Sequence, residues 1–536
     1  MTRRRGLLLL AAGTQALVLA ACAGGQPSAA PNSPSTAAPA ATPASTSPAA
    51  AANPTPQPKT GGTLRTTLVT DINNLDAHAG STPSYGSIYL AFDHLTAYDD
   101  QLQPQPMLAE SWDVSADLKQ IKLHLRKGVQ YHSGREFTSD DVKWNFLRVR
   151  DPKNASVSFV NQSKWFTSID TPDKYTVVLG SDQPRPAAFD FFEFINMSDQ
   201  VTVEGPDAAT KVVGTGPFVF KEWAQGDHVT MTRNPNYWLS GRPYLDEVDV
   251  RIIKDPQAQI AQLEAGAVDL VLSPSLRDFA RLRADSDYVG LLHPYAGTFY
   301  MQGVNVLNTP FDNKMVRQGL SYAIDRQHIA DSVLLGTGQP TSMPWLSNSA
   351  AYEASKDQFF TFDLDKARSL LNQAGVSELT CQILPIPSNP ELVDMAQIYQ
   401  ADLAKIGVTL NITQVDAASW FDQANNRKYN GFYSTLNGLA QLEPITLLLG
   451  GRVYDPNSNN SGYQNDAYAS LLNQAASEPD KTRRQALYSQ INDILLDQAW
   501  AMPIATGQPR VLTRAAVHGI GYTLWSSFSY TNAWLA

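Results

Sequence analysis

Residues 108–142 read LAESWDVSADLKQIKLHLRKGVQYHSGREFTSDDV, and three local signals follow one another in this stretch. Residues 121–125 alternate apolar and polar side chains, which predicts a half-buried strand. Lys127-Gly128 is then a turn, and Thr138 with Asp141 three residues later is typical of a capping box that opens a helix. A strand, a turn and a capped helix in this order predict an α/β fold in which helices cover sheets.

Strand and helix signals alternate through the rest of the chain as well. In the second half we expect a helix from Asp312 to Leu335, a helix over 364–374 capped by Asp363, a helix from Asn389-Pro390 to Gly407, a strand over 408–413, and helices over 467–476 and 481–496. No fixed repeat and no second low-complexity linker divides residues 59–536, so the units of this body are expected to be closely joined.

Composition excludes several classes of protein. The chain has 536 residues, 41 basic and 51 acidic side chains, and a net charge of −10. This acidic balance argues against nucleic acid or an anionic membrane surface as the main partner. The two cysteines, Cys22 and Cys381, are too few for a disulfide scaffold or a Cys-rich zinc site.

The N-terminus reads as an export signal. Arg3, Arg4 and Arg5 precede an apolar run that ends in Leu-Ala-Ala-Cys22, which resembles a bacterial lipoprotein signal. We expect residues 1–21 to be removed and Cys22 to carry the lipid; the alternative is an ordinary signal peptide that contains a cysteine. Residues 22–58 hold the lipidated Cys and an Ala/Pro/Ser/Thr tether without large apolar side chains. The folded body is expected from Lys59 onward.

Motifs for catalysis, metals or cofactors are absent from the sequence. It has no HExxH, GxSxG, GxxxxGK or CxxC pattern. His124 and His132 flank a turn, but two polar residues on adjacent strands explain them more simply than a metal site. Gly214-Thr215-Gly216-Pro217 leads into a strand and is expected to be a tight turn. We expect no catalytic residue, no metal and no cofactor.

Aromatic residues are abundant, with 10 Trp, 21 Tyr and 20 Phe. Most must lie in the core, but several stand in loop-like contexts next to Asn, Ser or Gly. These are Tyr85, Trp165, Trp345, Trp420 and Tyr463. Loop aromatics of this kind suit a cleft that holds a polar organic solute by stacking and hydrogen bonds.

The segments at 108–112, 124–134 and 137–142 closely resemble the signature of the extracellular solute-binding proteins of family 5, the peptide-, dipeptide- and nickel-binding receptors of ABC importers. Further segments match in order at 213–218, 233–238, 263–269, 310–326, 366–371 and 406–408. Together they cover nearly all of residues 61–520.

The resemblance implies a periplasmic-binding-protein-like clamshell of two lobes with a third inserted lobe, as in oligopeptide receptors. Lobe I is expected over 59–97, 200–302 and 503–536, lobe II over 98–199, and lobe III over 303–502. The signature motifs themselves look like fold devices and not like ligand contacts.

The ligand pocket departs from the peptide-receptor pattern. Where such receptors carry Gly-Trp-x-x-Asp-x-x-(Asp/Glu)-Pro, this chain reads LNGLAQLEP over 436–444. Ala440 then stands in place of the aspartate that pairs with the peptide ammonium, and Asn437 in place of the tryptophan. A short gap would make Glu443 that partner instead. The candidate ligand-binding residues implied by family position are Tyr85, Tyr300, Trp420, Asn437, Glu443 and Tyr463.

We expect a monomeric, lipid-anchored receptor, without catalysis, that closes on a peptide or similar small solute between lobes I and III and delivers it to ABC permease subunits. Its place is the extracytoplasmic side of the cell membrane, touched only through the lipid, with no nucleic-acid partner. Three alternatives stay open: a non-peptide solute such as an oligosaccharide, an opine-like compound or a metal chelate; a transporter-independent sensor or chaperone; and a hydrolase without a local motif.

Overall fold

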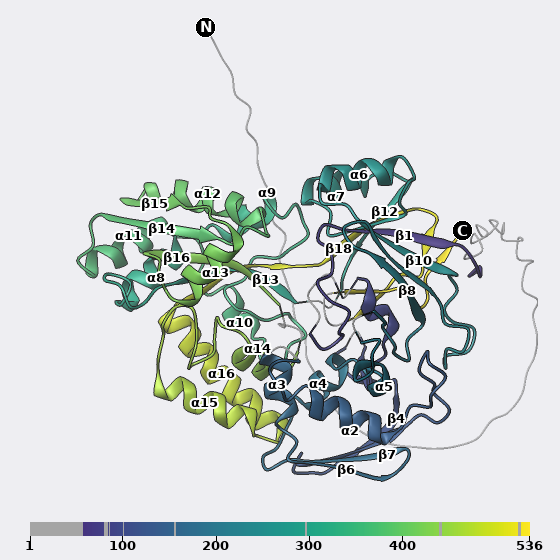
Figure 1. The fold of residues 1–536 in the computed structure, drawn as a ribbon. Helices are drawn as coiled ribbons and strands as arrows, with labels where there is room; N and C mark the ends of the chain where they lie inside the picture. The colour runs from purple at the N-terminus through teal and green to yellow at the C-terminus, as the bar shows by residue number, and fades with distance from the viewer. Residues whose placement is uncertain are drawn as a thin grey trace, which may run out of the picture. The chain divides into compact units, whose positions relative to one another are not determined.

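The computed structural model describes residues 57–79, 84, 86–99, 101–154, 157–208, 210–294, 297–438, 442–523 and 527–536, without the side chains of 157–159 and 527. All of them belong to one compact unit, Pro56–Ala536. Three β-sheets of four to seven strands organise this unit, and helices pack on them (Figure 1). This confirms the predicted α/β class.

The largest sheet has seven strands in the order β12-β18-β11-β1-β10-β9-β8. Their bounds are β1 Thr63–Leu68, β8 Phe218–Ala224, β9 His228–Arg233, β10 Glu247–Ile252, β11 Leu270–Leu272, β12 Tyr288–Leu292 and β18 Arg510–Arg514. β1 is parallel to β10 and β11, and the other neighbours are antiparallel. Helices α6 (Pro256–Glu264) and α7 (Leu276–Leu282) pack against β11, β12 and β18.

The stretch 108–142 supplies two strands of a four-stranded antiparallel sheet with the order β4-β5-β7-β6. Its strands are β4 Ala109–Val114, β5 Gln120–Leu125, β6 Ser168–Asp173 and β7 Thr176–Gly180, with helices α2 Ser139–Arg148, α3 Val157–Ser163, α4 Ala188–Phe194 and α5 Gln200–Val203. The predicted capping box is present at the start of α2, where Asp141 accepts from the Thr138 N–H at 2.8 Å. The apolar sides of β5, β7, α2 and α4 meet in one core.

The third sheet has five strands in the order β15-β14-β16-β13-β17. They are β13 Thr298–Val304, β14 Leu379–Pro385, β15 Val408–Ile412, β16 Gly431–Asn437 and β17 Ala501–Gly507. Its helices are α8 Lys314–Tyr322, α9 Arg326–Ser332, α10 Ala354–Asp357, α11 Leu364–Gln373, α12 Glu391–Ala404, α13 Ala417–Asn425, α14 Pro444–Gly450, α15 Asp466–Ala476 and α16 Lys481–Gln498. The short remaining elements are η1 Ile88–Ala91 and the strand pairs β2 Thr96–Tyr98 with β3 Pro104–Pro106, β19 Val517–His518 with β22 Trp534–Leu535, and β20 Gly521–Thr523 with β21 Ser527–Ser529.

Two expectations about chain organisation need correction. The single helix expected from Asp312 to Leu335 is two helices, because Asn313 caps α8 and Asp325 caps α9 by accepting from the His328 N–H. Residues 298–302 of β13 and 503–507 of β17, expected in lobe I, belong to strands that both lie in the five-stranded sheet. β17 pairs with β13, and β13 pairs with β16 of the expected lobe III. The division into lobes otherwise stays a prediction.

Candidate functional site

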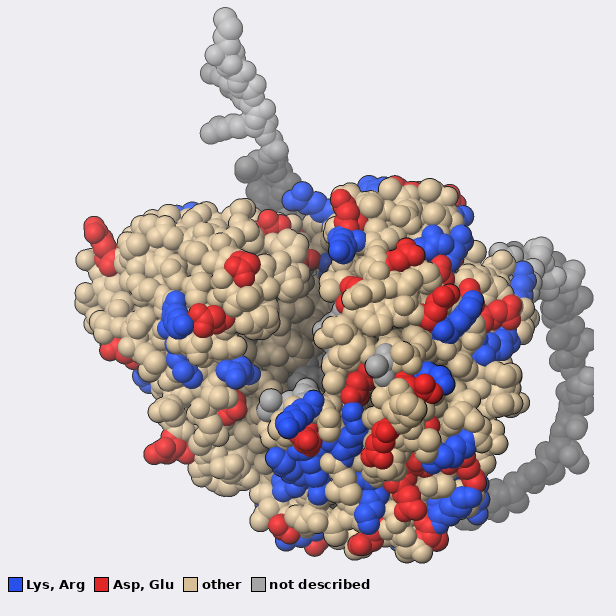
Figure 2. Space-filling model, viewed as in Figure 1, with Lys and Arg blue, Asp and Glu red and all other residues tan. Residues whose placement is uncertain are grey.

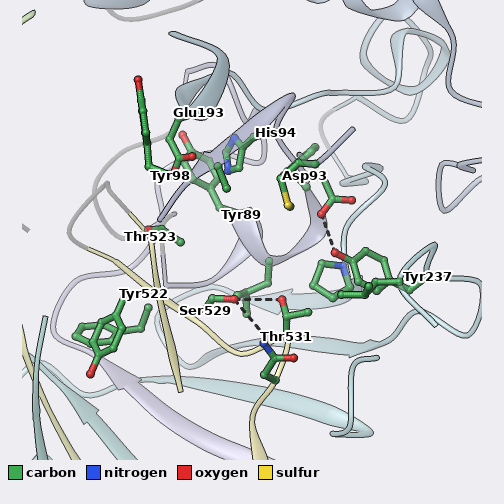
Figure 3. A pocket seen from close by; sticks show the side chains of 18 of the residues that line it. Tyr89, Asp93, His94, Tyr98, Glu193, Tyr237, Tyr522, Thr523, Ser529 and Thr531 are labelled. Carbon is green, nitrogen blue, oxygen red and sulfur yellow. Dashed lines mark hydrogen bonds between the residues drawn. The ribbon is translucent and has the colours of Figure 1, made fainter. Parts of the chain in front are cut away.

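A cavity of about 290 Å³ lies beside the seven-stranded sheet (Figure 3). Its walls are mostly apolar and come from segments far apart in the sequence. They are η1 and the following residues to Tyr98, Met107, the end of α4, Pro217, residues 237–239, and the hairpin of β20 and β21 with residues 531–532. None of these residues lies in 303–502, so this cavity is not the cleft expected between lobes I and III. Such a concave, largely apolar space with a few polar groups is typical of a small-molecule site.

The carboxylate of Asp93 holds the aromatic wall of this cavity in place. Its Oδ1 accepts from the Tyr237 hydroxyl at 2.9 Å, and its Oδ2 accepts from Trp238 Nε1 at 2.8 Å and from the Thr215 hydroxyl at 3.0 Å. Burial raises the pKa of this carboxyl, and the three donors oppose the shift. The Arg126 guanidinium lies over the Trp238 ring, 4.4 Å from its centroid. Both oxygens of the Asp93 carboxylate therefore already accept hydrogen bonds from protein side chains.

Two glycines of the turn at 214–217 let this wall form. A Cβ on Gly214 would lie 2.1 Å from the Ala91 carbonyl oxygen, and one on Gly216 would lie 2.5 Å from the Ala91 carbonyl carbon. The Gly216 N–H donates to that carbonyl oxygen at 3.0 Å. This close backbone approach, which larger residues would prevent, puts Thr215 within reach of Asp93.

Further polar groups line the cavity, among them His94, Tyr98 and Thr523. Burial lowers the pKa of His94 to about 4, so its imidazole is neutral at pH 7. Among the described residues, His94 Nδ1 and Thr523 Oγ1 are buried atoms without a hydrogen-bond partner. Tyr98 donates its hydroxyl proton to Asp190 Oδ1 at 2.9 Å. The cavity thus offers hydrogen-bonding groups within an aromatic frame, and the buried carboxylate of Glu193 is also among its lining residues (Figure 3).

Three residues named from the sequence lie outside the described part of the chain: Cys22, Tyr85 and Ala440. Three others are buried. Tyr300 in β13, Trp420 in α13 and Tyr463 are 3%, 3% and 6% exposed. The Trp420 indole donates to the Leu384 carbonyl at 2.9 Å. Tyr463 stacks on Trp500 with ring centroids 4.0 Å apart. We call the five-stranded sheet and the helices that pack on it the body on the five-stranded sheet. Trp420 and Tyr463 belong to its core.

Asn437 and Glu443 flank the segment that departs from the peptide-receptor pattern. Asn437 is half-buried at the end of β16. Glu443 precedes α14, and its Oε1 accepts from Arg484 Nε and from the Tyr488 hydroxyl, both at 2.8 Å. Its carboxylate is therefore already paired within the body on the five-stranded sheet. Neither residue lines the cavity.

A largely buried ion pair near Tyr300 joins the seven-stranded sheet to helix α12 of the five-stranded sheet. Arg510 of β18 donates to Glu391 of α12 at 2.8 Å, and the two side chains are 12% and 13% exposed. Burial raises the pKa of Tyr300 to about 12, and the charge of Glu391 adds to the shift. On the face shown in Figure 2, a groove separates the surfaces over these two sheets.

Sequence reasoning missed most of the cavity. Tyr237 and Trp238 belong to a matched segment that we interpreted as a fold device, and Thr215 belongs to the turn at 214–217. The signal that could have identified them is the pair of adjacent aromatics after Asn-Pro-Asn, which we did not use to predict the site. Tyr98, His94 and Tyr522 carry no local sequence signal that distinguishes them from core residues.

Within the described ranges, no group of three or more His, Cys, Asp and Glu side chains is arranged to hold a metal ion. His124 pairs with Asp113, and His132 contacts the Gly216 carbonyl. In the same ranges no helix combines the length and the apolar character that crossing a membrane requires.

Comparisons with known proteins agree with this fold. The family model of bacterial extracellular solute-binding proteins, family 5 Middle, matches residues 103–447. Heme-binding protein A of Haemophilus influenzae is 31% identical over 432 residues, 75% of this chain and 78% of that protein. Di/tripeptide-binding protein 1 of Pseudomonas aeruginosa is 30% identical over 467 residues, 80% and 85% of the two chains.

Two solved structures show the same architecture. AgaA of A. tumefaciens in complex with agropinic acid has a TM-score of 0.73 at 26% identity and covers 89% of this chain and 99% of its own. NikA of Brucella suis in complex with Fe(III)-EDTA has a TM-score of 0.79 at 21% identity, which speaks to the fold alone, and covers 89% and 100%. The family match spans more than half of the 536 residues, and the chain belongs to the bacterial extracellular solute-binding proteins of family 5, receptors of ABC importers.

Proposed function

We propose that this receptor captures a small peptide-like solute whose apolar or aromatic group enters the cavity beside Trp238 and Tyr237. The observation that carries the proposal is the engagement of Asp93 by three donors. This engagement fixes the aromatic wall, and it leaves His94, Tyr98 and Thr523 as hydrogen-bonding groups of the lining beside the buried carboxylate of Glu193. The relative named above as a di/tripeptide-binding protein supports this size of solute.

The proposal includes how the solute is held. An ammonium group buried without a carboxylate partner is strongly unfavourable. Glu443, the alternative partner left open by the sequence, is paired with Arg484 and Tyr488. Glu193 at the end of α4 is the other carboxylate of the cavity lining and is 4% exposed. We expect stacking and hydrogen bonds to contribute more to affinity than an ion pair between Glu193 and a solute ammonium.

Calorimetric titration with Ala-Phe and N-acetyl-Ala-Phe tests this mode of binding. Acetylation should change affinity by less than about tenfold, or ~1.4 kcal/mol. Trp238→Ala should weaken binding by roughly thirtyfold, since truncating an aromatic anchor removes about 2 kcal/mol. Trp112→Ala is the matched control, because Trp112 packs on Phe189 away from the cavity. A loss of about a hundredfold on acetylation would reveal a carboxylate clamp and overturn the proposal.

The receptor is further proposed to be a monomer without catalysis, anchored through a lipid on Cys22 and delivering its solute to permease subunits. Leu-Ala-Ala-Cys and the tether of small residues behind it support the anchor. Cys22→Ser should move the protein from the membrane fraction to the soluble fraction or leave the precursor uncleaved. If this variant still pellets with membranes after a high-salt wash, the lipid anchor is wrong.

A further inference from the structure

The carboxylate of Asp190 in α4 lies between the cavity and the body on the five-stranded sheet. Its Oδ1 accepts from the hydroxyl of Tyr98, which lines the cavity. Its Oδ2 accepts from the Glu443 N–H at 3.2 Å and from the Thr446 hydroxyl, both at the start of α14. Asp190 is 1% exposed, and none of the described cations lies within ion-pair distance of it. One buried side chain therefore connects three elements that are distant in sequence.

The start of α14 is held from its other side as well. The Glu443 carboxylate accepts from Arg484 and Tyr488 of α16. Leu442, the residue before it, is 4% exposed and belongs to the core under the four-stranded sheet. A change at Asp190 therefore acts on a segment that bridges two cores.

We propose that Asp190 is a positioning residue for solute binding, which holds the start of α14 against the cavity wall at Tyr98. The solute-binding role of this link rests on the proposed function of the cavity. A solute that moves the Tyr98 hydroxyl changes one of the three hydrogen bonds of Asp190. The other two bonds pass that change to α14.

Protonation provides a way to observe this link. Burial raises the pKa of Asp190 to about 7, the charge of Glu443 adds to the rise, and the donors Thr446, Tyr98 and the Glu443 N–H oppose it. The titratable and charged groups that face it are Tyr98 of β2, Glu193 of α4, and Glu443 of α14, with Arg484 and Tyr488 behind Glu443.

The direction of the pH dependence follows from the pKa of Asp190 in two states, one with α14 docked on α4 and one with α14 released. When α14 separates from α4, Asp190 becomes hydrated and its pKa falls toward the usual value of about 3.9. The docked state therefore keeps the proton to higher pH than the released state. Docking is strongest below about pH 4, weakens by up to about tenfold per pH unit as pH rises toward about 7, and changes little above that.

Hydrogen exchange of the full-length protein, followed by mass spectrometry between pH 5 and 8.5 and corrected for intrinsic rates, tests the link without any solute. Protection of peptides over 442–450 should fall as pH rises from 5 to 7 and then level off. In Asp190→Asn the amide oxygen can accept from Glu443 and Thr446 while the amide donates to Tyr98, so docking persists and the pH dependence disappears. Asp190→Ala should lose protection at every pH.

Asp182→Asn is the matched control, because Asp182 is exposed on the segment before α4 and accepts a hydrogen bond from the Thr167 hydroxyl. It should keep the wild-type profile. Thr446→Val removes one donor and should lower protection while keeping the pH dependence. If wild-type protection is constant from pH 5 to 7, or if Asp190→Asn keeps the wild-type slope, the proposal is wrong.

A second experiment, in which solute is added, distinguishes a failure of this proposal from a failure of the proposed function. With saturating Ala-Phe, exchange over 442–450 should slow in wild type and respond less in Asp190→Ala, because the link from Tyr98 is broken. If Ala-Phe does not bind wild type at any pH, the peptide assignment fails, while the solute-free exchange profiles still decide whether Asp190 holds α14.

Discussion

Replacing Asp93 should destabilise the protein in an order set by its three hydrogen bonds. Asp93→Ala removes the acceptor of Trp238 Nε1–H, of the Tyr237 hydroxyl and of the Thr215 hydroxyl at once. A buried donor without an acceptor costs about 1–3 kcal/mol. The indole N–H is fixed by its ring, whereas the two hydroxyls can rotate and water from the cavity can reach them. We therefore expect a loss of about 2–4 kcal/mol of unfolding free energy.

Asp93→Asn should be much milder, with a loss below about 1.5 kcal/mol. The asparagine oxygen can take the place of Oδ2 and accept from Trp238 and Thr215, while its amide donates to the Tyr237 oxygen. Urea unfolding followed by circular dichroism measures both variants. Asp113→Ala is the control, because its carboxylate is 72% exposed and pairs with the surface residue His124; it should stay within about 0.5 kcal/mol. Equal midpoints for Asp93→Ala and Asp113→Ala would refute the role of Asp93 in holding the wall.

Three further predictions follow from buried groups. Cys381 is buried, and burial raises the pKa of its thiol to about 12. In Cys22→Ser protein, an aromatic disulfide reagent at pH 8 should therefore label Cys381 slowly until urea is added. Fast labelling of the folded protein would contradict this burial. Asp141→Ala removes the capping box of α2 and one of two ion pairs of Arg135, and should lower the unfolding free energy by about 1–2 kcal/mol in urea titrations; an unchanged midpoint would show that the cap is dispensable. Arg510→Gln leaves Glu391 without its partner and should cost about 3 kcal/mol, against no measurable loss for Lys221→Gln at an exposed pair.

Local signals in the sequence predicted local structure well. Thr138 with Asp141, and Asp363 before the helix that follows it, are caps in the structure because a side-chain acceptor at that position satisfies a free N–H. The same physics explains the error at 312–335. The apolar stripe through Val316, Leu320 and Ile329 continues past Tyr322, but Asp325 offers a new cap, so the chain starts a second helix there.

The site could be predicted only in part, because it depends on which distant segments meet. Trp420 and Tyr463 have loop-like neighbours in sequence, yet tertiary packing places one against Tyr433 and the other on Trp500. In the sequence, Tyr237 and Trp238 cannot be distinguished from core aromatics. In the structure, Asp93, 144 residues away, accepts a hydrogen bond from the Tyr237 hydroxyl. A single sequence carries no signal for that pairing, since it arises from the contact of the 214–217 turn with Ala91.

The central claim is that this receptor holds a small solute in the cavity bounded by Trp238 and Tyr98. Mass spectrometry of the small molecules released when freshly purified protein is denatured tests it most directly, with wild type compared to Ala97→Phe, whose new ring would fill the cavity. Ala116→Phe, at an exposed turn, is the control. We predict a solute released in near-stoichiometric amount from wild type and from Ala116→Phe, and strongly depleted from Ala97→Phe. Equal release from all three proteins would contradict the assignment of this cavity.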